Sequence, residues 1–185
     1  MTQPLQPLPP VRRIVTAIDA DGRSYIAEDG ESPATLTVPD RPAYRNANLW
    51  RTVGNRPSVD APDTITEHRG VLPPSGGTVL RVIDIPPEAA DPEERKRQSA
   101  AIFAAMFADA THRPGNDQPA GMHETATVDY AILLQGELVA VMDNEETVMR
   151  AGDILIQRGT NHAWSNRSSQ VARIAFILID ARMPE

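Results

Sequence analysis

Turn residues divide the C-terminal part of the chain into short apolar segments, and this spacing limits the fold more than any other feature. From about residue 122 onward, a turn signal recurs every 7–10 residues. Segments of this length that are rich in Val, Ile and Leu are typical of β-strands in a sandwich or a small barrel. The sequence therefore predicts an all-β fold here. The dividing turns are Gln135-Gly136, Asp143-Asn144, Ala151-Gly152-Asp153, Gly159-Thr160 and Arg167-Ser168-Ser169.

Two segments upstream of this region also predict regular structure. Residues 76–88 alternate, which indicates a strand that enters the main sheet; one face would carry Val79, Arg81, Ile83 and Ile85. Residues 91–110 predict the one helix, with Asp91 as N-cap and Pro92 at the first helical position. Its apolar stripe, which includes Phe103 and Phe107, is interpreted as ordinary packing against the sheet or a subunit partner.

The chain length and the distribution of proline predict one domain with an appended arm. The 185 residues include 17 prolines, which are concentrated in the first half and interrupt regular structure there. We expect residues 1–75 to form an N-terminal arm whose extra strands pack on the barrel. Residues 76–185 would form the barrel itself, with a helical insertion at about 89–120.

Charge and composition exclude several classes of protein. A formal net charge of −7 argues against nucleic acid as the main partner, because phosphate binding requires a concentrated positive surface. No window approaches the ~18 uninterrupted apolar residues of a membrane span. The absence of cysteine excludes disulfides, thiolate ligands and a cysteine nucleophile. We expect a cytoplasmic protein that binds a small molecule and no organic cofactor.

A polar strand face begins the all-β region. His123, Thr125, Thr127 and Asp129 alternate along the chain, so in a strand their side chains point the same way. Burying such a face is costly unless it lines a ligand site or an active site. The plainer alternative is that a buried histidine is hydrogen-bonded to the carboxylate and has no further role.

A second polar segment can meet the first across the interior. His162 and Trp164 share one face of a predicted strand, and the turns before them allow their strand to lie near His123. A histidine paired with a carboxylate is a competent general base. We predict catalytic roles for His123, Asp129 and His162. The predicted substrate-binding residues are Thr125, Thr127, Met142 and Trp164.

Two motifs in these segments resemble those of the cupin family of small β-barrels. In the first, His123 is followed by Thr125 in place of a second histidine, Asp129 in place of a glutamate, and then a glycine. The second runs from a glycine through a short strand to a glycine, a histidine and an asparagine; its residues are Gly152, Gly159, His162 and Asn166. The resemblance covers about residues 76–180 and implies a jelly-roll β-barrel with one inserted helix.

The resemblance also implies a metal, a set of functions and an assembly. In cupins the motif positions usually hold a divalent metal, here Fe, Mn or Zn on His123, Asp129 and His162. The implied function is metal-assisted lyase or isomerase chemistry, either dehydration or decarboxylation of a small oxygenated metabolite. The alternatives are a non-haem Fe(II) dioxygenase and a cupin that binds a small molecule without turning it over. We also expect a homodimer, because small barrels of this kind often pair through their sheets.

Overall fold

The computed structural model of the chain describes residues 5–107, 109–110 and 121–184, so residues 111–120 of the predicted insertion lie outside the described residues. The described residues form three β-sheets, one α-helix and one short 3-10 helix, η1 (Ile65–Glu67). The strands are β1 (Arg12–Ile18), β2 (Ser24–Glu31), β3 (Ala34–Thr37), β4 (Arg45–Thr52), β5 (Thr78–Ile85), β6 (Thr127–Gln135), β7 (Glu137–Met142), β8 (Glu146–Arg150), β9 (Ile154–Arg158), β10 (His162–Ser165) and β11 (Ala172–Asp180).

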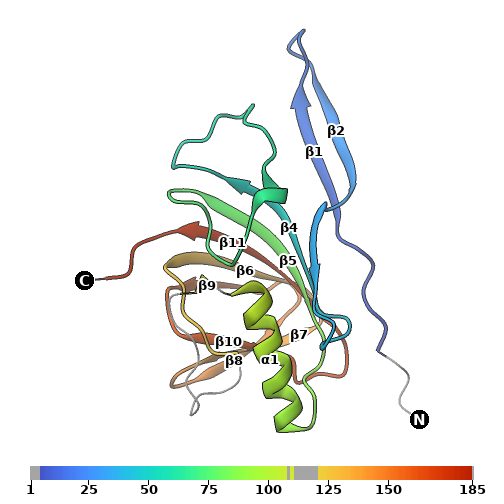
Figure 1. Cartoon of the computed structure of the whole chain (residues 1–185), viewed down its shortest axis with the longest axis vertical. Helices are drawn as coiled ribbons and strands as arrows, with labels where there is room; N and C mark the ends of the chain where they lie inside the picture. The colour runs from blue at the N-terminus through green and yellow to red at the C-terminus, as the bar shows by residue number, and fades with distance from the viewer. Residues whose placement is uncertain (1–4, 108, 111–120, 185) are drawn as a thin grey trace.

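Two of these sheets face each other and enclose the core. A six-stranded sheet in the order β3-β4-β5-β11-β6-β9 lies against a three-stranded sheet in the order β10-β7-β8 (Figure 1). The buried residues between them come from both sheets, for example Leu133 and Ile174 from the first and Leu138 from the second. Short antiparallel strands with one face in a shared core are what the recurrent turns predicted. The predicted all-β jelly-roll fold is confirmed.

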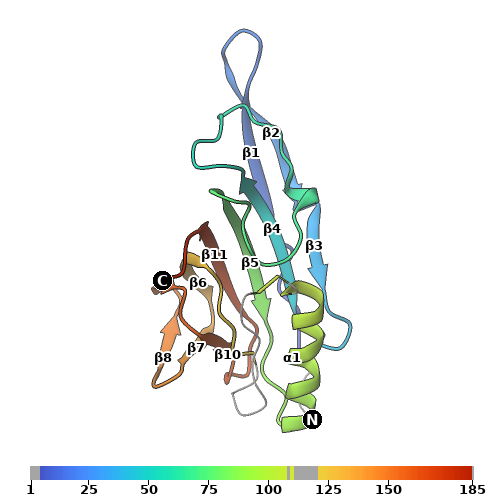
Figure 2. The same ribbon diagram turned by 60° about the vertical axis from the view of Figure 1, so that its left-hand side comes forward.

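The inserted helix lies beside the barrel. Helix α1 (Pro92–Met106) begins where the sequence predicted, and the side chain of Asp91 accepts a hydrogen bond from the backbone N–H of Glu93. It ends at Met106, four residues before the predicted end at residue 110, and Phe107 is its C-cap. The helix lies beside the six-stranded sheet (Figure 2). Ile102 and Met106 of its apolar stripe are buried in the core. Within the described residues, no helix has the length and hydropathy needed to cross a membrane.

The N-terminal strands divide between two places. β1 and β2 pair only with each other and form a hairpin that projects from the body (Figures 1 and 2). β3 and β4 instead extend the six-stranded sheet, because β4 pairs antiparallel with β5. The six-stranded sheet therefore contains strands from both sides of residue 75. We propose that this residue separates the arm from the barrel.

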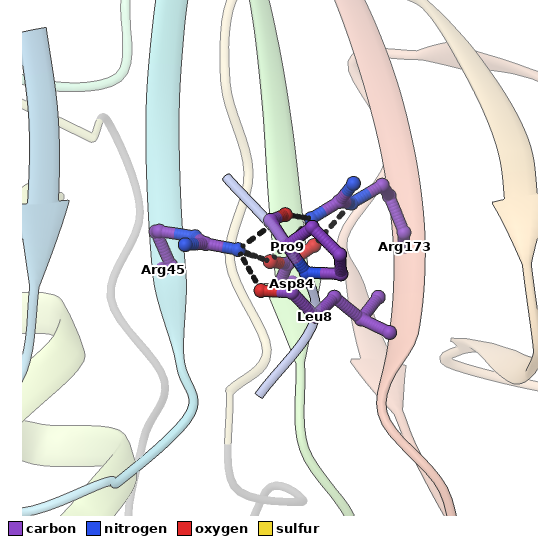
Figure 3. Close-up of polar contacts among 5 residues, drawn as sticks. All are labelled: Leu8, Pro9, Arg45, Asp84 and Arg173. Carbon is purple, nitrogen blue, oxygen red and sulfur yellow. Dashed lines mark hydrogen bonds and ion pairs between the residues drawn. The ribbon is translucent and has the colours of Figure 1, made fainter. Parts of the chain in front are cut away.

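The segment before β1 crosses the outer face of the six-stranded sheet. Asp84 of β5 is only 2% exposed and pairs with Arg45 of β4 and Arg173 of β11, at N–O distances of 2.7 and 2.6 Å. The carbonyl oxygens of Leu8 and Pro9 accept further hydrogen bonds from these arginines (Figure 3). A buried carboxylate thus connects three neighbouring strands and holds the N-terminal segment over them.

Candidate functional site

A cavity opens between helix α1 and the inner face of the barrel. Its volume is about 110 Å³. On the same scale a single buried water requires about 10–15 Å³. The cavity therefore has room for a small organic molecule. Its walls are mainly apolar and aromatic, from Phe103, Phe107, Trp164 and Phe176 among others. Its polar lining residues are Arg41, Tyr44, Arg81, Glu88, Arg95, Gln98, Ser99, His123, Thr125, Asp129 and His162.

The two predicted histidines meet at the wall of this cavity. His123 and His162 form an isolated antiparallel bridge in which each backbone N–H donates to the other's carbonyl, at 2.9 and 3.0 Å. Their ring centroids are 4.3 Å apart. Residues paired in this way present their side chains on the same face, which explains why the two imidazoles lie together.

Backbone carbonyls determine the protonation of both imidazoles. Nδ1 of His123 lies 2.9 Å from the carbonyl oxygen of Gly121, and Nδ1 of His162 lies 2.9 Å from that of Thr160. A carbonyl only accepts, so each Nδ1 must carry the proton and each Nε2 keeps its lone pair. Burial lowers the pKa of His123, and burial followed by the neighbouring His123 lowers the pKa of His162 to about 3. Both rings are neutral at neutral pH.

Asp129 lies in the same cavity but is held differently. It lies on β6 between Leu178 of β11 and Gln157 of β9, and it is 4% exposed. Its Oδ1 is buried without a hydrogen-bond partner in the described part of the chain. Burial raises the pKa of Asp129 to about 6, against the opposing effects of a hydrogen bond from Thr127 and the charge of Arg81. This acid therefore titrates close to neutral pH.

The donor set can be compared with what a divalent metal requires. A metal-binding histidine commonly donates its second ring N–H to a carbonyl, and both histidines here do so. Over the described ranges, however, no three His, Cys, Asp or Glu side chains are grouped so as to share an ion. The two histidine rings are oriented as metal ligands commonly are, but the structure brings no third ligand of these kinds to them among the described residues. Asp129, whose Oδ1 has no partner there, is a candidate third ligand that is not grouped with them.

The other predicted site residues are distributed over three positions. Thr125 and Trp164 line the cavity, and the Trp164 ring is edge-on to His162 with centroids 5.7 Å apart. Thr127 does not line it but shares a 2.8 Å hydrogen bond with the Thr125 hydroxyl. Met142 lies opposite His162 in the β7–β10 pair, yet it lines a separate hollow with Glu145 and Thr160.

Several residues of the cavity were not identified from the sequence. Arg81 lines the cavity and is buried. The sequence placed this arginine on the apolar face of β5 but assigned it no role in the site. Phe103 and Phe107 also line it, and the Phe107 ring centroid lies 4.7 Å from that of His123, so their role extends beyond packing. A charged residue in an otherwise apolar strand face was the one available signal. Nothing in the local sequence distinguished the two phenylalanines from core residues.

Two motif positions have structural roles. Asn166 is fully buried, and its Nδ2 donates to the carbonyls of Ile85 and Gln170 at 2.7 and 2.8 Å. Gly136 has a φ of +82°, and a Cβ placed there would lie 3.0 Å from the Cα of Ala172. A left-handed backbone in such close contact favours glycine. These two residues shape the turns that align the strands.

Comparison with known proteins places these features in a family. The family model described as Cupin domain matches residues 109–179. The chain is 27% identical over 184 residues to a cupin-domain-containing oxidoreductase of Aspergillus ruber, an alignment that covers 96% of this chain and 76% of that protein. It is 32% identical over 109 residues to phomopsin biosynthesis cluster protein C' of Diaporthe leptostromiformis, covering 58% of this chain and 42% of the relative.

The chain therefore spans less than half the length of the phomopsin-cluster relative. Among solved structures, a cupin 2 conserved barrel domain protein from Salinispora arenicola superposes with a TM-score of 0.42 at 14% identity, over 78% of this chain and 82% of that chain. The matched segment at 109–179 contains both histidines, Asp129 and the turns of the barrel. Residues 109–179 of this chain are therefore similar to a cupin domain.

Proposed function

We propose that the cavity binds a small oxygenated organic molecule and catalyses proton transfer beside its carbonyl group, as in a lyase or an isomerase. One observation carries this proposal. Two neutral imidazoles, whose Nε2 atoms make no hydrogen bond within the described residues, line one largely apolar cavity together with an acid whose pKa is about 6. Groups with such shifted pKa values gather where a fold performs acid–base chemistry.

Asp129 is the proton-transfer group in this proposal. An efficient general acid or base has a pKa near the working pH, and the value of about 6 meets that condition. His162, with a pKa of about 3, is a weak base, so its Nε2 is better suited to bind than to remove a proton. The aromatic wall formed by Phe107 and Trp164 excludes water and strengthens these polar contacts.

The histidine pair would hold a divalent metal, either Fe, Mn or Zn. Such an ion acts as a Lewis acid that polarises a carbonyl or carboxylate oxygen. His123 and His162 would bind it through Nε2, with their rings oriented by the Gly121 and Thr160 carbonyls. Alternatively, Asp129 would bind the metal as a third ligand and would then not act as the base. Dehydration and decarboxylation are the two reactions we expect.

The proposal is tested by hydrogen exchange in deuterium oxide. We would incubate the protein with a panel of α-keto, β-keto and β-hydroxy acids and follow the α-hydrogens by proton NMR. We expect exchange or product formation with at least one compound, and its loss in Asp129→Asn and His162→Gln. The control is Tyr130→Phe, which changes the next residue of β6 on the outer face. Equal activity in all variants would contradict the proposal.

Metal binding requires a separate measurement. Elemental analysis of protein purified without added metal should find about one divalent ion per chain. His162→Ala should lose it, whereas Tyr130→Phe should retain it. Native protein that contains no metal and takes up none would leave proton transfer by Asp129 without the metal as the mechanism.

A second candidate is an iron-dependent oxidoreductase. It is favoured by the names of three relatives, from Aspergillus ruber, Neurospora crassa and Hypocrea virens, each called a cupin-domain-containing oxidoreductase. Oxygen consumption that depends on added Fe(II) and on a substrate would support it. Tight binding with neither oxygen uptake nor hydrogen exchange would indicate a non-catalytic cupin instead.

We further propose a cytoplasmic homodimer. The location is supported by the cysteine-free composition. The dimer is supported by apolar side chains on the outer face of the barrel, where Tyr130 of β6 lies opposite Ile156 of β9. Tyr130, Ile154 and Ile156 are 40%, 62% and 52% exposed. A second copy of the chain would cover this face.

A further inference from the structure

Arg81 is a buried cation at the wall of the cavity. It lies on β5, opposite Phe176 of β11, and is 2% exposed. The neighbouring inward side chains of its own strand, Val79 and Ile83, are aliphatic and buried. A guanidinium in such surroundings has lost its hydration, and this loss is costly unless an anion replaces the water.

The position of the guanidinium is fixed from one side. Its Nη2 donates to the carbonyl oxygen of Val71 at 2.8 Å and contacts Nε2 of His68 at 3.1 Å. An arginine has only donors, so His68 must accept through this nitrogen. Burial, followed by the charge of Arg81, lowers the pKa of His68 to about 4, which keeps that ring neutral. Two neutral acceptors therefore orient Arg81 without balancing its charge.

One further donor of Arg81 has no partner in the described part of the chain. Its Nε is buried and makes no hydrogen bond within the described residues. Burial lowers the pKa of Arg81 to about 10, so the side chain still carries its charge at neutral pH. Arg81 thus combines a fixed position, a charge and a buried donor without an acceptor, and the residue forms part of the cavity wall. Such a combination is typical of a residue that binds a ligand.

The groups around Arg81 do not supply its counter-ion. Tyr44 is neutral, because burial raises its pKa to about 12. The Asp109 carboxylate accepts from the backbone N–H groups of Val71 and Leu72 at 2.8 and 3.0 Å. The charges of Asp109 and Asp129 both favour the charged form of Arg81, but in the described part of the chain no ion pair within 4 Å joins Arg81 to a carboxylate. A carboxylate in direct contact with the guanidinium is left for a ligand to supply.

We infer that Arg81 anchors the ligand through a carboxylate, so that the molecule bound in the cavity is an organic acid with an apolar body. This inference rests on the proposed function and names the class of its substrate. The aromatic walls formed by Phe103, Phe107 and Trp164 suit the apolar body. The oxygen function to be transformed would then lie at the histidines and Asp129, with the carboxylate at Arg81.

The inference is tested by equilibrium binding with matched charged and uncharged probes. Benzoate and hexanoate carry the carboxylate, and benzamide and hexanamide have nearly the same shape without the charge. Binding is followed by the shift in melting temperature and by tryptophan fluorescence in a Trp50→Phe background, where Trp164 in the cavity wall is the remaining tryptophan. For wild type we expect Kd values about 10- to 100-fold lower for the acids than for the amides, as for a charge-assisted hydrogen bond.

Arg81→Gln should remove this preference, so that acid and amide bind equally weakly. Arg158→Gln is the matched control, because Arg158 is an exposed arginine at the end of β9 outside the cavity and should retain the preference. If Arg81→Gln does not fold, Arg81→Met takes its place and should likewise lose the preference for acids, because it also removes the charge. If Arg81 only stabilised the fold, the ratio of the Kd for the amide to the Kd for the acid would be the same in wild type and in every folded variant.

Three results would overturn the inference: wild type that binds acids no better than amides, an Arg81 variant with an unchanged preference, or inorganic phosphate that binds more tightly than either acid. Failure here is distinguishable from failure of the proposed function. Binding of acids through Arg81 without hydrogen exchange would contradict the proton-transfer chemistry alone. Exchange on uncharged ketones, unaffected by Arg81→Gln, would contradict the carboxylate anchor alone.

Discussion

The burial that raises the pKa of Asp129 also lowers the stability of the folded chain at neutral pH. Its pKa is about 6 in the folded chain against 3.8 for the ordinary side chain, so the folded state binds the proton more tightly. The associated stability is fully present below about pH 4 and is lost as the pH rises through about 6. The difference of two pKa units corresponds to about 3 kcal/mol, the cost of keeping an ionised carboxylate in the cavity at neutral pH.

Replacing Asp129 by Asn should therefore stabilise the protein at neutral pH. We expect the free energy of unfolding of Asp129→Asn to exceed that of wild type by about 2 kcal/mol at about pH 8, and to match it near pH 4. Urea unfolding in the presence of EDTA measures both values. The histidines also make the free energy of unfolding depend on pH. Their contribution is the same in Asp129→Asn and wild type, so it cancels when one free energy is subtracted from the other. A difference that does not change with pH would show that Asp129 titrates normally.

At the scale of elements, helix α1 and the residue after it form the lid of the cavity. The Phe107 ring meets His123 edge-on at 4.7 Å and helps to keep water from it. Truncating this ring admits water, and a better-hydrated imidazole is protonated more easily. In Phe107→Ala the pKa of His123 should rise toward its ordinary value of 6.5. An NMR titration of the imidazole tests this. The control is Tyr25→Ala, an aromatic truncation on the projecting hairpin, which should leave the His123 titration unchanged.

The ion pairs of Asp84 act on three elements at once. Asp84 joins β5 to Arg45 of β4 and Arg173 of β11, and both arginines also hold the N-terminal segment (Figure 3). Removing one partner of a buried pair leaves the others uncompensated, so Asp84→Asn should lower the free energy of unfolding by about 3 kcal/mol.

Chemical denaturation measures this loss. Asp29→Asn is the control, because Asp29 pairs with Arg12 on the exposed hairpin, where water screens the charges. We expect no measurable change in that variant. Equal losses in the two variants would mean that the Asp84 cluster contributes no more than a surface pair.

At the scale of the whole molecule, the assembly depends on which apolar surface a second copy covers. The outer face of β6 and β9 offers Tyr130, Ile154 and Ile156, whereas the hairpin exposes Ile18 at 66%. If the sheet face forms the dimer, Ile156→Lys should give a monomer, because a buried lysine without a partner is unfavourable at an interface. Ile18→Lys should remain dimeric. Light scattering on a sizing column separates these outcomes. A monomeric wild type would contradict the homodimer.

The sequence by itself determined the features that depend on local periodicity. Turn residues at short intervals predicted the strands, alternation placed Asp129 and Thr125 on one inward face, and Asp91 with Pro92 marked the start of the helix. The proximity of His123 and His162 was also predicted, although they are paired side by side in an antiparallel bridge and do not meet across the interior. These features follow from the period of a strand or a helix, which neighbouring residues suffice to specify.

Only the tertiary structure decided the rest of the site. Arg81 became a cavity residue through its pairing with β11 and its contact with His68, and Phe107 reached His123 because the helix packs across the barrel. Among the described residues, the structure also left Asp129 outside any group of three possible metal ligands. These contacts join residues distant in the chain, so they depend on how the sheets and the helix pack rather than on local pattern. Local sequence determines which way a side chain points, and packing determines what it meets.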